Sequence, residues 1–465
     1  MTTSDRTASA WVVLAATSLA VFAVFLDTTI GFVSFPAISA TFRSSGPSTL
    51  SWVLNAYTLV FAALLIPMGR LADRIGRRRM FLIGVIVFTA GSMLCGLAPN
   101  VGFLIGAEML EAVGAAILVP SSLALVLQTF PRQKIPVAVA IWGAIGAVAG
   151  AAGPTLGALV VSNLSWRWAF YINLPVGVIS FVLGRTVLPE GREAHPGRLP
   201  DPIGVVLLAS GIALVTYAIV ETNSWGWASG RFAITVLAAA ALVVGFLVRC
   251  NRVANPLIHL DLFRTNNFRW ANAAMVIFAI GFNAMFLGNV LFLTRVWKYS
   301  ILRAGLAISV GPLIVAATAP FLGKLAGRIG QRRLLMPGGL LWGAGGVYLI
   351  ARATTSADYL GTYLPAVACT GIGVALCLPQ LSSAAVQGLP PDQFGAGSAI
   401  AQAVRTFGST FGVALVIAFT TGAGAVDALE GFHHVWWLLA GSGLAVSVLS
   451  TRLLRVGAPA ASAPR

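Results

Sequence analysis

The chain has 465 residues, of which 58% are hydrophobic and only 9% charged, and this balance excludes a soluble globular protein. Its formal net charge of +16 would suit nucleic acid in a soluble domain, but here the arginines lie between apolar runs, where membrane topology explains them. We therefore expect a polytopic, all-α protein in a lipid bilayer, with no nucleic-acid partner.

The first apolar run, about residues 11–35, is too long for a signal-peptide core and predicts an uncleaved span. Asp27 lies inside it. A carboxylate midway through a span is costly unless it faces a cavity or is neutral, which makes Asp27 a candidate functional residue. Low dielectric favours the uncharged form, so Asp27 suits a proton carrier, with a structural polar contact as the alternative.

A basic stretch, GRLADRIGRRR at 69–79, follows the second run, and we expect it to form a tight loop at one membrane face. Gly69 and Gly76 allow the backbone to turn and the helices to approach, and Asp73 is the one acid among five arginines, suited to be a helix cap or ion-pair acceptor. The candidate gating residues are Gly69, Asp73, Arg74, Gly76 and Arg77. A cluster that merely fixes orientation is the alternative reading.

A near copy of this stretch, GKLAGRIGQRR at 323–333, occurs 254 residues later. A cluster that served only to orient the chain would not recur, so two copies predict two homologous halves. The apolar runs number about fourteen at ~20 residues each, and the basic stretches follow the second and tenth. We therefore expect a six-helix half (1–190), a linker with an inserted helix pair (191–255) and a second six-helix half (256–465).

An even number of spans places both termini on one side. With the termini inside, about 22 lysines and arginines are cytoplasmic and about 7 are outside, which predicts cytoplasmic termini. The main exception is the cluster of Arg295, Lys298 and Arg303 in an outside loop. The scarcity of lysine beside abundant arginine, alanine and glycine suggests a GC-rich bacterial genome, hence a bacterial inner membrane.

In the fourth run, Glu108 and Glu111 are three residues apart and share a helix face. If that face meets the first span, both glutamates and Asp27 line one cavity. Three close carboxylates cannot all ionise cheaply, so at least one should hold a proton near neutral pH. The alternative is that Glu108 lies near the outer face and is merely solvated.

Other runs carry small or polar residues in patterns that suggest packing or binding. The fifth run has small residues and one proline at spacings that allow tight helix packing and a kink: Gly146, Gly150, Gly153, Pro154 and Gly157. The candidate substrate-cavity residues are Asn55, Tyr57, Asn272, Phe282, Asn283, Phe286, Gln402 and Arg405. Arg405 lies within a span, so it must pair with an acid or a carbonyl, or reach water.

Catalysis, cofactors and metals are not expected. The chain has no Walker loop, His-Glu-x-x-His or Gly-x-Ser-x-Gly motif, and its four cysteines suit core positions without a disulfide. His433 and His434 lie beside Asp427 and Glu430, and we interpret them as part of a solvated outside loop rather than a metal site.

Several motifs resemble those of a known family. The two basic stretches resemble the signature loop between the second and third helices of major facilitator superfamily transporters. Four further segments resemble the superfamily's fourteen-span drug:proton antiporter branch. They are LDTTI at 26–30, the polar residues around Asn55, the string at 397–405 and, most specifically, WRWAFYINLPVG at 166–177. The glycines of the fifth run resemble the antiporter motif that marks exporters in this superfamily.

The sequence departs from the family pattern at two places. Phe32 stands where the branch usually has asparagine. In the fourth span, 104–112 aligns with the family pattern, but Glu108 occupies the arginine position and Glu111 the glutamine position. The resemblance implies that the family arginine governs protonation of a nearby acid, so coupling in that form is not expected here.

The resemblance implies a major facilitator fold and a monomeric, proton-coupled exporter that moves lipophilic, often cationic drugs by alternating access. Two rivals stay open. One is an exporter of an endogenous lipid or metabolite, and the other is a sensor or assembly partner that lost transport together with the arginine of the fourth span.

Overall fold

The computed structural model describes residues 3–131, 134–190, 201–389, 394–421 and 429–454. In these residues the regular structure is helical. The helices are α1 (Thr3–Thr41), α2 (Pro47–Ile75), α3 (Arg77–Gly96), α4 (Val101–Thr129), α5 (Ile135–Asn163), α6 (Trp166–Tyr171), α7 (Asn173–Val187), α8 (Pro202–Val220), α9 (Thr222–Trp225), α10 (Gly230–Arg252), α11 (Asn266–Leu291), α12 (Ile301–Ile329), α13 (Gln331–Arg352), α14 (Leu364–Val386), α15 (Phe394–Thr421) and α16 (Glu430–Ser450).

Fourteen spans are present in the described residues, counted as helical segments long and apolar enough to cross a membrane. This confirms the predicted all-α polytopic fold and the predicted number of spans. The sixth span consists of two helices, α6 and α7, which are separated at Ile172.

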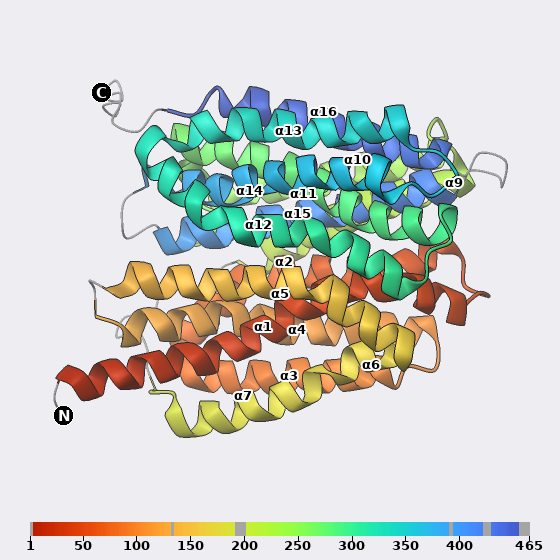
Figure 1. Cartoon of the computed structure of the whole chain (residues 1–465). Coiled ribbons are helices and arrows are strands. Elements are labelled where there is room, and N and C mark those ends of the chain that lie inside the picture. The colour runs from red at the N-terminus through yellow and green to blue at the C-terminus, as the bar shows by residue number, and fades with distance from the viewer. Residues whose placement is uncertain (1–2, 132–133, 191–200, 390–393, 422–428, 455–465) are drawn as a thin grey trace.

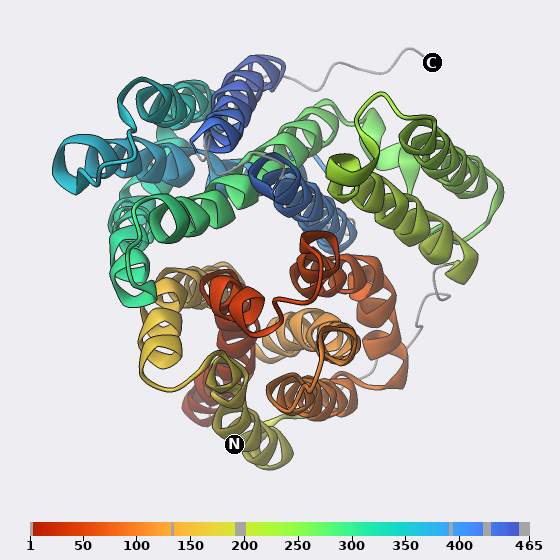
Figure 2. The same ribbon diagram turned by 90° about the vertical axis from the view of Figure 1, so that its right-hand side faces the viewer.

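The helices form two groups that pack in the same way. In the first group α2 packs on α4 and α1 on α5, and in the second group α12 packs on α14 and α11 on α15. Two seams join the groups, α2 with α15 and α5 with α12. Figure 1 shows the groups as two stacked bundles, and Figure 2 shows them along the helices.

Each basic stretch is mostly helical, so the expectation of a tight loop over the whole stretch is wrong. α2 continues to Ile75 and α3 begins at Arg77, which leaves a single residue, Gly76, between them. Gly76 has φ 128°, and its counterpart Gly330 has φ 87° between α12 and α13. Positive φ strains residues with a Cβ, so both turns require glycine. We call the end of the molecule that holds these turns the basic end.

The helices α8 and α10 pack against each other and lie beside only one of the two seams, next to α2 and α15 (Figure 2). Ile212 of α8 shares an apolar cluster with Ala63 of α2 and Phe407 of α15. At the start of α8, Asp201 caps the helix through the backbone N–H of Gly204 and forms an ion pair with Arg249 of α10. The hydrogen bond from this guanidinium holds the pKa of Asp201 below its usual value.

The two groups share their largest apolar core at the end opposite the basic end. This core contains Ile30 of α1, Val53 of α2, Val290 of α11, Ile308 of α12 and Ile417 of α15, among others. Nearer the basic end, two further large clusters each draw on one group only. The groups are therefore packed together most extensively at the opposite end.

Candidate functional site

Asp27 lies two-thirds of the way along α1, and its side chain is 7% exposed. The neighbouring threonines bond to their own helix: the Thr28 hydroxyl donates to the Val24 carbonyl at 3.0 Å, and the Thr29 hydroxyl to the Leu26 carbonyl at 2.9 Å. α1 therefore continues through this polar segment, and Asp27 is left to find a partner on another helix.

That partner is Asn173, the first residue of α7. Its Nδ2 lies within hydrogen-bond distance of Asp27 Oδ1 at 2.9 Å, the Ser92 hydroxyl oxygen at 3.0 Å and Glu111 Oε1 at 3.4 Å, so three acceptors share its two hydrogens. The Ser92 hydroxyl in turn donates to the Phe170 carbonyl at 2.9 Å. One amide thus links α1, α3, α4 and α7. Asn173 lies within the branch-like string 166–177 but carries no sequence signal of its own that marks it as functional.

Glu111 lies where α3 and α4 approach most closely. A Cβ added to Gly91 would lie 2.6 Å from the Glu111 Cα, so only glycine permits this approach. The Glu111 side chain is fully buried, and its Oε2 accepts a hydrogen bond from the Cys95 thiol with an S–O distance of 3.4 Å. All four cysteines are free thiols.

Glu108 is 5% exposed, so the alternative of a solvated side chain is wrong. Asp27 interacts electrostatically with both Glu108 and Glu111, and the two glutamates interact with each other. In the described residues, no lysine, arginine or histidine forms an ion pair with any of the three. The structure thus brings the three predicted acids together without a basic partner, and we call them the acid cluster.

The glycines of α5 pack mainly against α1 beside the acid cluster. A Cβ on Gly153 would lie 1.8 Å from the Thr29 Oγ1, one on Gly157 would lie 3.2 Å from Ile30, and one on Gly146 would lie 3.0 Å from Phe25. A Cβ on Gly150 would meet nothing within 4 Å.

The other side of α5 meets α12 in the second group. A Cβ on Gly305 of α12 would lie 2.6 Å from the Pro154 carbonyl oxygen, and the Thr155 and Ser309 hydroxyls are 2.5 Å apart. α5 therefore connects the helix that carries Asp27 to the opposite group.

The two candidates on α2 are buried and lack hydrogen bonds. Both side-chain polar atoms of Asn55 and the hydroxyl of Tyr57 have no partner among the described residues. Tyr57 interacts electrostatically with all three acids, so it lies at the acid cluster. Across the seam, the Thr58 and Thr410 hydroxyls are 3.2 Å apart.

The candidate side chains on α11 have different partners, some within α11 and some on neighbouring helices. Asn272 Nδ2 donates to the Phe268 carbonyl of the same helix, whereas Asn283 Nδ2 donates to the Ser409 hydroxyl of α15 at 2.8 Å. Phe282 is partly buried between Phe278 and Phe286. Phe286 also contacts Phe32 of α1, with ring centroids 5.4 Å apart, so Phe32 joins the two groups.

On α15, Gln402 and Arg405 are both partly exposed. In the described part of the chain, neither side chain has a hydrogen-bond or ion-pair partner.

The charged residues at the basic end hold the helix ends together. Asp73 Oδ1 accepts from Arg77 Nε at 3.0 Å and from Nη2 at 2.9 Å, which agrees with its predicted role as an ion-pair acceptor. Arg77 also donates to Gln128 at the end of α4, at 3.1 Å. In the second group, Gln331 donates to Ser383 of α14 at 3.2 Å, at nearly the equivalent place.

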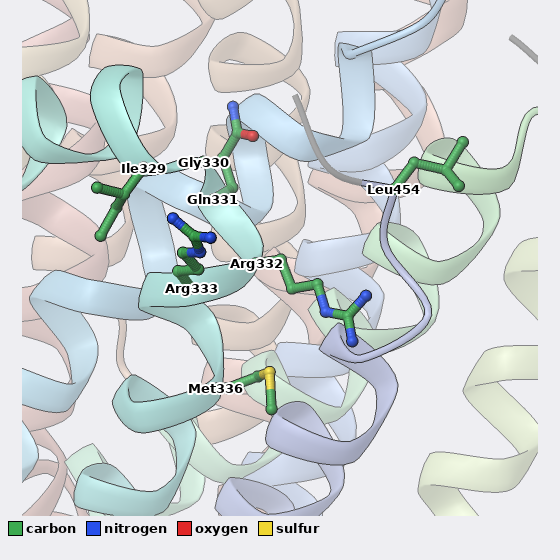
Figure 3. Close-up of a pocket in the computed structure, with 7 residues that line it drawn as sticks. All are labelled: Ile329, Gly330, Gln331, Arg332, Arg333, Met336 and Leu454. Atoms are coloured by element: carbon green, nitrogen blue, oxygen red, sulfur yellow. The ribbon is translucent and has the colours of Figure 1, made fainter. Parts of the chain in front are cut away.

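A cavity of about 210 Å³ lies beside the second basic turn (Figure 3). It is lined by Ile329, Gly330, Gln331, Arg332, Arg333, Met336 and Leu454. None of the candidate substrate-cavity residues lies there, so this cavity does not support their predicted role.

His433 and His434 lie in the first turns of α16, so their prediction as loop residues is wrong. Asp427, which the sequence places beside them, is outside the described residues. In the residues that are described, no group of three histidine, cysteine or acidic side chains is arranged to hold a metal ion.

Comparisons with known proteins agree with the fold. The sequence model of the Major Facilitator Superfamily matches residues 17–293 and 272–465. The chain is 35% identical to the multidrug resistance protein Stp of Mycobacterium tuberculosis over 404 residues, 87% of this chain and 74% of that protein. It is 32% identical to the cephamycin export protein CmcT of Amycolatopsis lactamdurans, over 90% of this chain and 86% of that protein.

A crystal structure of a D-xylose–proton symporter matches with a TM-score of 0.70 at 14% identity, over 96% of this chain and 98% of that chain. At this identity the likeness supports the fold alone.

Proposed function

The chain belongs to the major facilitator superfamily, and on that premise we propose that it is a proton-coupled exporter of lipophilic, often cationic compounds. Relatives named as a multidrug resistance protein, a cephamycin export protein and a tetracenomycin C resistance and export protein support export of drug-like molecules. We therefore propose that the chain takes part in multidrug efflux and antibiotic resistance.

The acid cluster is the observation that carries the proposal of proton coupling. Three carboxyl groups lie close together, all at most 7% exposed and without a basic partner in the described residues. Such groups cannot all be charged at low cost, so at least one exchanges a proton as its surroundings change. A purely structural role would not require three adjacent acids in a membrane-spanning group.

The mechanism that we propose is alternating access. Protons from outside bind the acid cluster, substrate leaves, and the protons are released inside once the groups have rearranged. The electrical gradient supplies about 2.3 kcal/mol per charge for each 100 mV. The gating residues at the basic end and the packing motif of α5 control the rearrangement, because the former join helix ends and α5 packs on both α1 and α12.

For the compartments, we propose a bacterial inner membrane, cytoplasmic termini and a functional monomer. α1 begins and α16 ends at the basic end, on the left of Figure 1, as an even number of spans requires. If this end is cytoplasmic, the large shared apolar core closes the outer side.

The division into residues 1–190, 191–255 and 256–465 is proposed as the functional one. In this division, the acid cluster belongs wholly to the first half. The second half contributes four residues to the proposed substrate path: Asn283, Phe286, Gln402 and Arg405. Asn55, Tyr57, Asn272 and Phe282 complete the proposed path.

The test is efflux of the fluorescent cation ethidium from bacterial cells that express the full chain, with and without an uncoupler. Efflux that exceeds an empty-vector control and collapses with the uncoupler is expected. Efflux that survives the uncoupler would contradict proton coupling. If neither ethidium nor a panel of drugs is exported but lipid is exported from vesicles, the lipid exporter is favoured. If nothing is transported, the sensor is favoured.

A further inference from the structure

Asn173 is placed to act on two of the three acids. It is 1% exposed at the start of α7, and its single Nδ2 lies within hydrogen-bond distance of Asp27 Oδ1, Glu111 Oε1 and the Ser92 hydroxyl. In the described residues Glu108 has no hydrogen bond to this amide, so Asp27 and Glu111 are the two acids that the amide bridges.

The orientation of the amide follows from its acceptors. The Asn173 Oδ1 is buried and has no donor, and the Ser92 hydrogen is already used on the Phe170 carbonyl. No donor therefore fixes the orientation of the amide through its Oδ1. The orientation is fixed by the carboxylate and hydroxyl oxygens around Nδ2. Hydrogen bonds donated to a carboxylate favour its ionised form.

Among the hydrogen bonds of the described residues, no donor other than Asn173 reaches both Asp27 and Glu111. The titratable side chains that interact electrostatically with Asp27 and Glu111 are Tyr57 on α2, Cys95 on α3 and Glu108 on α4. Cys95 donates only through a thiol, which is a weak donor, and it reaches only Glu111 Oε2. In this part of the described structure, Asn173 is thus the donor common to both acids.

Building on the proposed function, we propose that Asn173 is a positioning residue that holds Asp27 and Glu111 as one proton-exchanging pair and stabilises the pair when it has released its proton. It does so with a neutral amide, and no arginine or lysine takes part. The proton moves between water and one carboxylate of the pair. Asn173 itself neither gains nor loses a proton.

The test measures protons released when tetraphenylphosphonium is added to the purified full-length chain, across a pH series. Asn173→Leu removes the donor at nearly constant volume, and Asn173→Ala removes it without risk of overpacking. Both should move the midpoint of proton release upward by about one pH unit, because the ionised pair has lost its donor. The same shift should appear in a Glu108→Gln background, since Asn173 does not bond to Glu108.

Ser180→Ala is the matched control. Ser180 lies on the same helix and is fully buried, with a hydroxyl that lacks a partner in the described residues. It should leave the midpoint unchanged, which separates loss of the donor from disturbed packing of α7.

Two outcomes would overturn the inference. Midpoints of Asn173→Leu and Asn173→Ala that coincide with the wild type, while the wild type releases protons, would refute the role of Asn173 and leave the proposed function standing. A wild type that binds tetraphenylphosphonium but releases no protons at any pH would overturn the proposed function, and the inference with it.

Discussion

At the scale of single residues, the chemistry of the first group depends on how its buried acids are supported. Asp27 and Glu111 receive hydrogen bonds from Asn173, and Glu111 also from Cys95. In the described residues the Glu108 side chain has no hydrogen bond, and it interacts with Asp27 by charge. This difference suggests that Glu108 is the acid most free to meet a cationic substrate.

A substitution at Glu108 should therefore discriminate between substrates by their charge. Glu108→Gln should weaken binding of tetraphenylphosphonium about tenfold, ~1.4 kcal/mol, because an ionised carboxylate attracts the cation. Binding of neutral chloramphenicol should change little. Isothermal titration of both compounds checks this, and an equal loss for both would argue against a role for Glu108 in charge recognition.

Glu108→Arg, which restores the family residue, provides the matched variant. It should keep uncoupler-sensitive transport but shift preference from cationic to neutral compounds, because the positive charge repels cations. A variant that transports cations as well as the wild type does would contradict the assignment.

The three buried acids were predictable from the sequence, but the hydrogen bonds that Asn173 makes to two of them were not. A carboxylate inside an apolar run is rare enough to be noticed, and the spacing of Glu108 and Glu111 predicted a shared helix face. Asn173 carries no such signal, because asparagine near a span end is ordinary. Its role depends on the break at Ile172, which starts α7 beside Asp27 and which no spacing rule predicts.

At the scale of elements, α5 shows that glycines of one motif are not equivalent. A Cβ on Gly153 would overlap the Thr29 hydroxyl, whereas one on Gly150 would meet open space. The sequence pattern predicted close packing, but only the packing of α5 on α1 distinguishes the positions.

Gly153→Ala should therefore impair transport and Gly150→Ala should not. Overpacking at Gly153 costs about 1–3 kcal/mol and pushes α1 from α5, so ethidium efflux should fall about tenfold. Efflux and thermal stability of the two variants in parallel provide the measurement. Similar behaviour of both would mean that this contact does not matter for transport.

The turns at the basic end also differ between the two groups. Asp73 forms an ion pair with Arg77, but the equivalent position in the second stretch is Gly327. Sequence comparison revealed the repeat. It did not reveal that each turn is a single glycine, because helix propensity cannot distinguish a loop from two helices joined at one residue.

Asp73→Asn should reduce transport severalfold with little change in tetraphenylphosphonium affinity, because the loss falls on the arrangement of helix ends rather than on the substrate path. Gly327→Asp should have a smaller effect, since that group works without an acid there. Transport and binding assays of both variants decide the matter. Equal losses in both assays would defeat the idea that the turns have different roles.

At the scale of the whole molecule, the number of spans and the internal repeat were predictable because hydrophobic length and the two basic stretches are strong signals. How the groups meet was not. The shared core at the opposite end, with the contact of Phe32 and Phe286, depends on side chains more than 250 residues apart in the sequence. The packing of α8 and α10 beside only one seam likewise has no signature in either helix.

The orientation of the whole molecule can be tested directly. The proposal that both termini are cytoplasmic rests on the excess of arginine at the basic end. A reporter enzyme that is active only outside the cytoplasm, fused after Arg465, should remain inactive, and the same reporter fused within the short α3–α4 connection should be active. The reverse pattern would invert the proposed direction of transport.

The most direct test of the account is substrate-triggered proton release by purified wild-type protein and by the Asp27→Asn variant near neutral pH. The account predicts that tetraphenylphosphonium displaces protons from the wild type, because the cation favours ionised carboxylates. Asp27→Asn should abolish both this release and uncoupler-sensitive efflux, while neutral compounds still bind. An Asp27→Asn protein that releases protons and pumps as the wild type does would contradict the central claim that the acid cluster carries the proton.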